Sequence, residues 1–267
     1  MRNIIVTLSL LLFFIGCGDT NNPVNDLTVE DDIGTLLETS TDIEVKASDT
    51  PTYPYDASFS TIQSLISNAD STGLTYICYG DSTRTDVYEN HYVFENVKEG
   101  LASHNVSAIN MSVTGIYAKQ AAGGMADGIS SSSDWSKVAQ AISGTGATTI
   151  LNISSIGLND YGEFSNEEIK SDIKKVITLI REQKPNTHFI LTVPGRTYYD
   201  AENMSNALIS IYQDLSNELS IPYINVPDEA MPLDELTLDW YRPGDQTHLA
   251  RDIQVVIANL ILSKILP

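Results

Sequence analysis

The stretch Leu74–Ser82, LTYICYGDS, decides the fold and supplies the first candidate for chemistry. Its first six residues are apolar or β-prone, and such a short run predicts a buried β-strand. Gly80 and Asp81 are turn-forming residues, so the strand is expected to end there. Ser82 then places a hydroxyl group immediately beyond the carboxyl end of a strand.

Further short apolar runs alternate with amphipathic stretches along the rest of the chain. Strands are expected at Leu74–Tyr79, Val106–Asn110, Thr148–Ser154, His188–Val193 and Pro222–Asn225. Helices are expected at Arg84–Ser103, Asp134–Ile142, Asn166–Gln183, Glu202–Leu219 and His248–Leu266. Strands that alternate with helices predict an α/β domain whose parallel sheet is covered by helices on both faces.

An aspartate and a histidine stand three residues apart near the C-terminus, at Asp245 and His248. A serine hydroxyl becomes a nucleophile when a base takes its proton, and His248 can serve as that base. Asp245 can fix the tautomer of the imidazole and stabilise the imidazolium. Because ligands of parallel α/β sheets bind at the carboxyl ends of the strands, Ser82 and this late loop are expected to meet there. The pattern predicts a Ser-His-Asp hydrolase.

Such chemistry also needs hydrogen-bond donors for the oxyanion that develops on the substrate. Three groups follow the first three expected strands and could supply them: the backbone N–H of Ser82, the backbone N–H of Gly115 and the side-chain amide of Asn159. A glycine at position 115 would let the backbone approach the substrate closely.

These segments resemble the four sequence blocks of the SGNH (GDSL-type) hydrolases. The blocks are Gly80-Asp81-Ser82, Gly115, Gly157-x-Asn159-Asp160 and Asp245-x-x-His248. They occur in family order between residues 74 and 250, with one departure, Thr83, where the family commonly has Leu or Ile. The chain also lacks the Gly-x-Ser-x-Gly pattern of the α/β-hydrolase nucleophile elbow.

The resemblance implies a three-layer α/β/α sandwich with a parallel, flavodoxin-like sheet. It implies that Ser82, Asp245 and His248 are catalytic, and that Ser82, Gly115 and Asn159 form the oxyanion hole. Members of the family are esterases, lipases, thioesterases and carbohydrate deacetylases.

No metal, cofactor or nucleic acid is expected to take part. No second His or Cys stands at the i+4 spacing from any of the four histidines, and the two cysteines form no cluster with them. The formal net charge of −20 argues against nucleic acid as a partner.

Residues 1–16 resemble the export signal of bacterial lipoproteins. Arg2 is their only charge, and Ile4–Ile15 is an apolar core too short to span a bilayer as a helix. Cys17 follows in the position of the lipidated cysteine, although Phe14 stands where Leu is usual. The resemblance implies that a lipid on Cys17 anchors the protein to a membrane. The alternative is an ordinary signal peptide that is cut elsewhere.

Three segments are expected: a lipoprotein-type signal peptide at 1–16, an acidic, mostly disordered tether with a lead-in at 17–70, and the SGNH hydrolase domain at 71–267. Between residues 18 and 50 the tether carries nine Asp and Glu residues against one Lys, a composition typical of disordered chains. Within its lead-in, residues 61–69 are expected to form a short helix on the edge of the domain.

Three side-chain expectations complete the site. Arg84 is expected on the surface in an ion pair, and Asp160 is expected to hold its turn rather than react. Trp240, Tyr241 and Arg242 lie just before the Asp245 loop, and they are expected either to line an acyl or sugar pocket or to anchor the loop.

The sequence thus predicts an exported serine esterase that is lipid-anchored in the bacterial cell envelope. Its expected substrate is an acyl ester, with short-chain or acetyl esters on glycans preferred. Gly18, rather than Asp, follows Cys17, which favours the outer membrane, with the domain in the periplasm or at the cell surface. Two alternatives stay open: an acyltransferase that passes the acyl group to a sugar hydroxyl, and a non-catalytic glycan-binding envelope lipoprotein.

Overall fold

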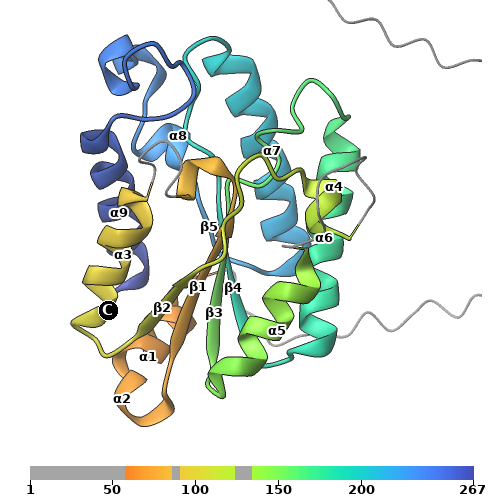
Figure 1. Ribbon diagram of the computed structural model, residues 1–267, viewed down its shortest axis with the longest axis vertical. Coiled ribbons are helices and arrows are strands. Elements are labelled where there is room, and N and C mark those ends of the chain that lie inside the picture. The colour runs from red at the N-terminus through yellow and green to blue at the C-terminus, as the bar shows by residue number, and fades with distance from the viewer. Residues whose placement is uncertain (1–57, 86–90, 124–133) are drawn as a thin grey trace, which may run out of the picture. The chain divides into compact units, whose positions relative to one another are not determined.

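The computed structural model describes residues 58–85, 91–123 and 134–267 (Figure 1). The expected signal peptide, Cys17 and the acidic part of the tether lie outside the described residues. Within the described ranges, no helix has both the length and the apolar character needed to cross a membrane.

Five parallel strands form one sheet in the order β2-β1-β3-β4-β5. They are β1 Thr75–Gly80, β2 Ser107–Asn110, β3 Thr149–Ser154, β4 Thr187–Thr192 and β5 Tyr223–Ile224. Each agrees with its expected strand to within one residue at either end. The chain runs from β1 outward to β2 and then returns to β3 on the other side of β1. The strand order therefore reverses between β1 and β3, where open α/β sheets bind ligands.

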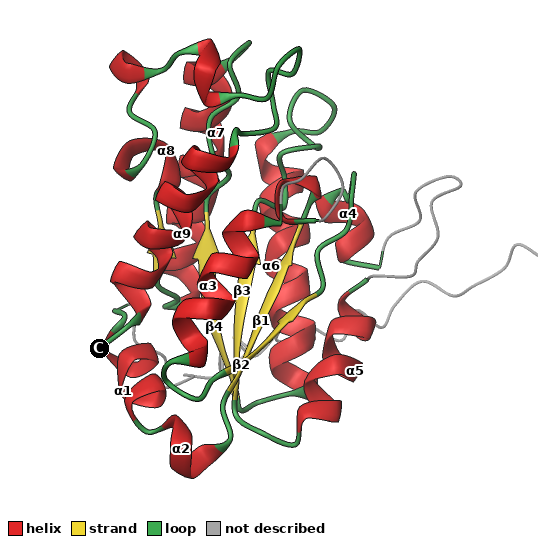
Figure 2. Ribbon diagram, turned by 60° about the vertical axis from the view of Figure 1, so that its left-hand side comes forward, coloured by secondary structure: helices red, strands yellow, loops and turns green. Residues whose placement is uncertain are grey.

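Helices cover both faces of the sheet and make three layers, as expected (Figures 1 and 2). One face carries α1 Ser60–Ser67, α3 Tyr92–Ala102 and α9 Arg251–Ile265. The other carries α4 Ala118–Ala121, α5 Trp135–Thr145, α6 Asn166–Gln183 and α7 Ala201–Leu219. Shorter elements are α2 Ala69–Thr72, α8 Val226–Glu229 and the 3₁₀ turns η1 Ser82–Arg84, η3 Leu233–Glu235 and η4 Leu238–Trp240.

The sheet separates two hydrophobic cores, because successive side chains of a strand point to opposite faces. From β1, Ile77 and Tyr79 enter the core shared with α5, α6 and α7. Tyr76 and Cys78 enter the core shared with α3 and α9. All six residues of β1 are buried, which explains why this strand reads as a continuous apolar run rather than an alternating one.

Two expected helices begin later than the sequence pattern suggested. The helix expected from Arg84 does not begin there, because Arg84 lies in a 3₁₀ turn and Thr85 is extended with φ −98° and ψ 166°; α3 begins at Tyr92. The last helix was expected to begin at His248 but begins at Arg251. In both cases an aspartate side chain binds nearby backbone N–H groups and stabilises a turn in place of a helical start.

The helix expected at residues 61–69 is present as α1. Its Ile62 and Ile66 are almost fully buried, with 2% and 1% of their surface exposed, in the core that contains α9. The packed domain therefore includes α1 and begins before residue 71.

Gly80, the last residue of β1, has no room for a side chain. A Cβ atom there would lie 2.1 Å from the carbonyl oxygen of Ser154 on β3. Since neither strand backbone can move freely, Gly80→Ala is expected to destabilise the protein by about 3 kcal/mol in urea unfolding. Gly144→Ala is the matched control: it lies in α5 with open space around it, and alanine should add about 0.5–1 kcal/mol of stability. Equal stabilities of the two variants would contradict this.

Candidate active site

The structure brings Ser82 and His248 together at the carboxyl edge of the sheet, the upper end in Figure 1. The Ser82 Oγ atom lies 3.2 Å from Nε2 of His248, a residue 166 positions later in the chain. Ser82 follows β1, next to the point where the strand order reverses, and His248 lies in the loop before α9. The two residues therefore become neighbours only in the folded domain, where the end of the first strand lies beside the loop that precedes the last helix.

Asp245 holds the other ring nitrogen of His248. Its Oδ2 lies 2.6 Å from Nδ1, while its Oδ1 accepts the backbone N–H groups of Thr247 at 2.7 Å and His248 at 2.9 Å. Burial tends to raise the pKa of Asp245, but the hydrogen bonds from His248 and Thr247 outweigh it, and the pKa is lowered. An ionised Asp245 accepts a hydrogen bond from the Nδ1–H group of His248, and in this tautomer Nε2 carries no proton and can accept a hydrogen bond from the Ser82 hydroxyl.

Asp81 shapes the turn that carries Ser82. Its Oδ1 accepts both the backbone N–H of Thr83 at 2.9 Å and the Thr83 hydroxyl at 2.7 Å. The side chain is fully buried, and burial raises its pKa. The sequence Gly80-Asp81-Ser82 thus combines a glycine that fits against β3, an aspartate that caps the turn and a serine that the turn presents.

Gly115 and Asn159 are linked in space although they follow different strands. Gly115 has a φ of +72°, a conformation that glycine adopts without steric cost. Ile116 follows Gly115, and its carbonyl oxygen accepts a hydrogen bond from the side-chain amide nitrogen of Asn159 at 3.1 Å. An amide nitrogen has two N–H groups, so this bond positions Asn159 and leaves its second N–H for another acceptor.

Asp160 was expected to hold its own turn, but its side chain binds the backbone of a distant segment. Both of its carboxylate oxygens accept the backbone N–H of Ala118, at 3.0 and 2.9 Å, and so hold the first residue of α4. Burial raises the pKa of Asp160 to about 6. The carboxylate fixes the distance between the Asn159 turn and the segment that follows Gly115.

The raised pKa of Asp160 gives a pH-dependent prediction. The folded state binds the proton more tightly than the unfolded state does, so this group's contribution to stability is full below about pH 4 and is lost as the pH rises through about 6. Asp160→Asn keeps an acceptor for Ala118 without the charge. In urea unfolding, its stability relative to wild type should therefore rise by about 2 kcal/mol between pH 4 and pH 7. Asp239→Asn, an exposed control, should show no such rise, and a constant difference for Asp160→Asn would refute the assignment.

Arg84 is buried, contrary to the expectation of a surface ion pair. Only 1% of its surface is exposed; its Nε donates to Ser154 Oγ at 3.0 Å and its Nη1 donates to the carbonyl oxygen of Thr83 at 2.9 Å. The guanidinium group thus ties the nucleophile turn to the end of β3. Sequence reasoning missed it because its partners are a backbone carbonyl and a serine 70 residues away.

Tyr241 anchors its loop rather than lining a pocket. It is 3% exposed, and its hydroxyl donates to the carbonyl oxygen of Arg196 at 2.8 Å. Among the residues that the structure describes, no group of three or more His, Cys, Asp or Glu side chains could hold a metal ion.

Comparison with known proteins finds similarity in structure but not in sequence. No family model matches the chain, and no curated protein matches it. A psychrotrophic esterase from Pseudoalteromonas superposes with a TM-score of 0.51 at 13% identity, over 72% of this chain and 96% of that one. A putative GDSL-like lipase from Parabacteroides merdae gives 0.53 at 16% identity, over 71% and 94%.

An acetyl-xylooligosaccharide esterase from Geobacillus also superposes, in a mutant form, with a TM-score of 0.53 at 13% identity, over 73% of this chain and 94% of that one. These three proteins are covered over 94–96% of their own length, so the likeness extends over their whole fold rather than a shared motif. This chain therefore has the fold of the GDSL-type (SGNH) lipolytic hydrolases.

Proposed function

We propose that this protein is a serine esterase in which Ser82, His248 and Asp245 form the catalytic triad. The observation that carries the proposal is the chain of contacts from Ser82 Oγ through both ring nitrogens of His248 to Asp245. The fold, which it shares with esterases and GDSL-type lipases, supports the same reaction class.

The reaction begins when Ser82 Oγ attacks the ester carbonyl carbon and its proton moves to Nε2 of His248. The tetrahedral intermediate collapses, and the alcohol leaves with the proton returned by His248. Water then attacks the acyl-enzyme by the same route and releases the acid, which restores Ser82. Throughout, Asp245 stabilises the imidazolium through Nδ1.

The negative oxygen of the intermediate would be held by the backbone N–H groups of Ser82 and Gly115 and by the side chain of Asn159. If so, Asn159→Ala should lower kcat about 10²–10³-fold with little change in KM, because the lost hydrogen bond forms fully only in the transition state. Steady-state hydrolysis of p-nitrophenyl acetate measures this. Asn203→Ala, on the exposed face of α7, is the control and should retain full activity. An Asn159→Ala enzyme that loses less than threefold would remove Asn159 from the oxyanion hole.

The proposed substrates are short-chain acyl esters, in particular acetyl groups on glycans. One structural neighbour is itself an acetyl-xylooligosaccharide esterase. The test is hydrolysis of p-nitrophenyl esters from acetate to long chains by the purified protein. Turnover that is highest for acetate supports the proposal, and turnover that increases with chain length overturns the short-chain preference.

We further propose that the protein is exported and held in the cell envelope by a lipid on Cys17. Expression of the full chain in a bacterial host, followed by membrane fractionation, tests this. Wild type is expected in the membrane fraction and Cys17→Ser in the soluble fraction, whereas an unchanged distribution would contradict the lipid anchor.

A further inference from the structure

A cleft opens beside the nucleophile turn, between the residues that follow Ser82, the first turn of α3 and the segment after β2. Its volume is about 560 Å³, and its lining residues are Thr85, Phe94, Glu95, Asn110, Ser112, Val113 and Thr114. That volume is within the range of pockets that bind small molecules. We call it the β2 cleft.

The β2 cleft adjoins the turn that carries Ser82 and the segment that leads to Gly115. The Thr85 hydroxyl donates to the carbonyl oxygen of Ser82 at 3.2 Å and lies 3.3 Å from the Thr114 hydroxyl. Thr114 in turn immediately precedes Gly115. The backbone N–H of Val113 donates to the carbonyl oxygen of Gly80 at 2.8 Å. A group bound in the cleft would therefore lie next to both the nucleophile and a proposed oxyanion donor.

The lining of the β2 cleft is rich in groups that both donate and accept hydrogen bonds. Three are hydroxyls, on Thr85, Ser112 and Thr114. Each hydroxyl offers one donor and two acceptor sites, so it can bind a ligand while keeping its protein partner. The Asn110 side chain instead makes hydrogen bonds within the protein. Its amide nitrogen donates to the carbonyl oxygen of Arg84 at 2.7 Å, and its amide oxygen accepts the backbone N–H of Ser112 at 3.1 Å.

The charge of the described lining is unfavourable for an anionic ligand. Among its described residues it contains a carboxylate, Glu95, and no Lys, Arg or His. Glu95 pairs with Lys98 at 3.1 Å, but both side chains are about half exposed, so this pair leaves the carboxylate accessible. A fatty acyl chain could contact Phe94 and Val113, but it would displace water from the three hydroxyls without replacing the lost hydrogen bonds.

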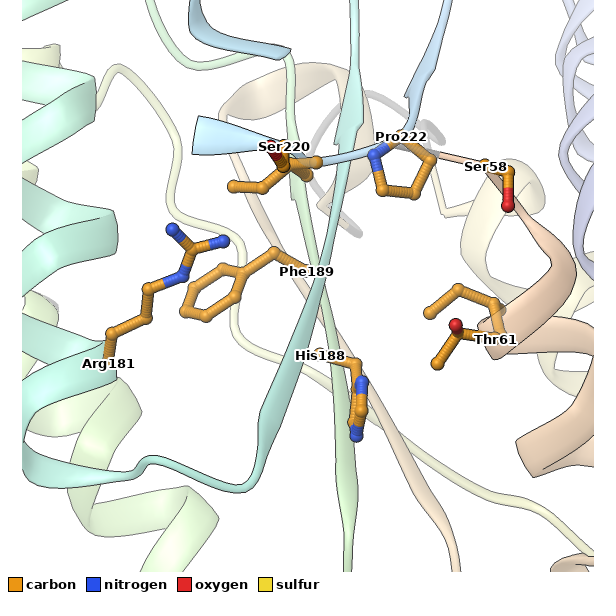
Figure 3. A pocket seen from close by; sticks show the side chains of 9 residues that line it. Ser58, Thr61, Arg181, His188, Phe189, Ser220 and Pro222 are labelled. Atoms are coloured by element: carbon orange, nitrogen blue, oxygen red, sulfur yellow. The ribbon is translucent and has the colours of Figure 1, made fainter. Parts of the chain in front are cut away.

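Two other cavities lie away from the site, near the amino-terminal ends of the strands. The smaller, which Figure 3 shows between Ser58, His188 and Pro222, has a volume of about 10 Å³, room for about one water molecule. The other is lined in part by Ala147 and Thr187, just before and at the starts of β3 and β4. Neither includes a candidate catalytic residue.

We propose that the β2 cleft binds a sugar unit of the substrate, the unit whose hydroxyl group carries the ester. The proposal rests on the proposed esterase function. It adds that the protein recognises the alcohol half of the ester, which would be a sugar with several hydroxyl groups. Sugar hydroxyls can donate to Glu95 and exchange hydrogen bonds with Ser112 and Thr114, so the polar groups on both sides would be satisfied.

The test compares two acetate esters that differ in the alcohol. One is p-nitrophenyl acetate, and the other is the best substrate of a panel of singly acetylated methyl glucoside, galactoside and xyloside. The test variant is the double substitution Ser112→Ala and Thr114→Val, which removes two hydroxyls with little change in volume. The control is Ser107→Ala with Thr178→Val, both exposed and neither among the residues that line the cleft.

The ratio of kcat/KM for the sugar acetate to that for p-nitrophenyl acetate should fall about 10- to 30-fold in the double variant, as expected for two lost hydrogen bonds. It should not change in the control. An equal loss on both substrates, or no fall in the ratio, overturns the sugar subsite while leaving the esterase intact. If kcat/KM of the double variant falls only for long-chain p-nitrophenyl esters, the cleft binds the acyl chain, and this result also overturns the sugar subsite. If wild type hydrolyses none of the esters, the proposed function fails, and the subsite proposal fails with it.

Discussion

Replacing Ser82 with alanine is expected to lower kcat/KM for p-nitrophenyl acetate about 10⁴- to 10⁶-fold, because no other group would then form the acyl-enzyme. The side chain is 7% exposed and small, and its hydroxyl is held 3.2 Å from His248 Nε2. Removal of a single oxygen should leave the fold unchanged. The variant should therefore unfold at the same urea concentration as wild type while its activity is lost.

Ser263→Ala on the exposed surface of α9 is the matched control, since it removes a serine hydroxyl far from the site. It should keep wild-type activity. A Ser82→Ala protein that is folded and retains more than a tenth of wild-type activity would show that the reaction does not proceed through Ser82.

Asp245→Asn is expected to lower kcat about 10⁴-fold, through the tautomer of His248 rather than through the fold. The Asn oxygen can replace Oδ1 as acceptor for the N–H groups of Thr247 and His248, so the loop should keep its shape. The Asn amide then faces Nδ1 and donates to it. The ring proton then lies on Nε2, and a protonated Nε2 can no longer accept the Ser82 proton.

The kinetic signature distinguishes this effect from misfolding. KM and urea stability should change little, while kcat falls. Asp239→Asn, an exposed aspartate in the same region of sequence, serves as the control and should be fully active. Loss of stability together with activity would instead assign Asp245 a structural role in its loop.

The strands and the layer arrangement could be predicted from sequence because local pattern determines them. Buried parallel strands appear as short apolar runs, and α6 begins and ends where its capping box and apolar stripe predict. Ser82, Asp245 and His248 could be selected as candidates because Ser82 follows an expected strand and the other two are three residues apart. Each of these signals lies within a few neighbouring residues.

The missed features depend on contacts between distant parts of the chain. The burial of Arg84 requires the hydroxyl of Ser154 on β3, and the link from Asn159 to Ile116 joins segments 43 residues apart. The β2 cleft combines three segments, one of which, around Thr85, was expected to be helical. The secondary-structure propensity of neighbouring residues does not predict such contacts, since the partners become neighbours only in the folded domain.

Covalent labelling shows directly whether Ser82 is the nucleophile. The purified protein is incubated with a fluorophosphonate, digested and analysed by mass spectrometry, in parallel with Ser82→Ala and Asp245→Asn. We expect one adduct, on the Ser82 Oγ, that is absent from Ser82→Ala and forms much more slowly in Asp245→Asn. An unlabelled wild-type protein, or an adduct on any other residue, would contradict a Ser82–His248–Asp245 esterase.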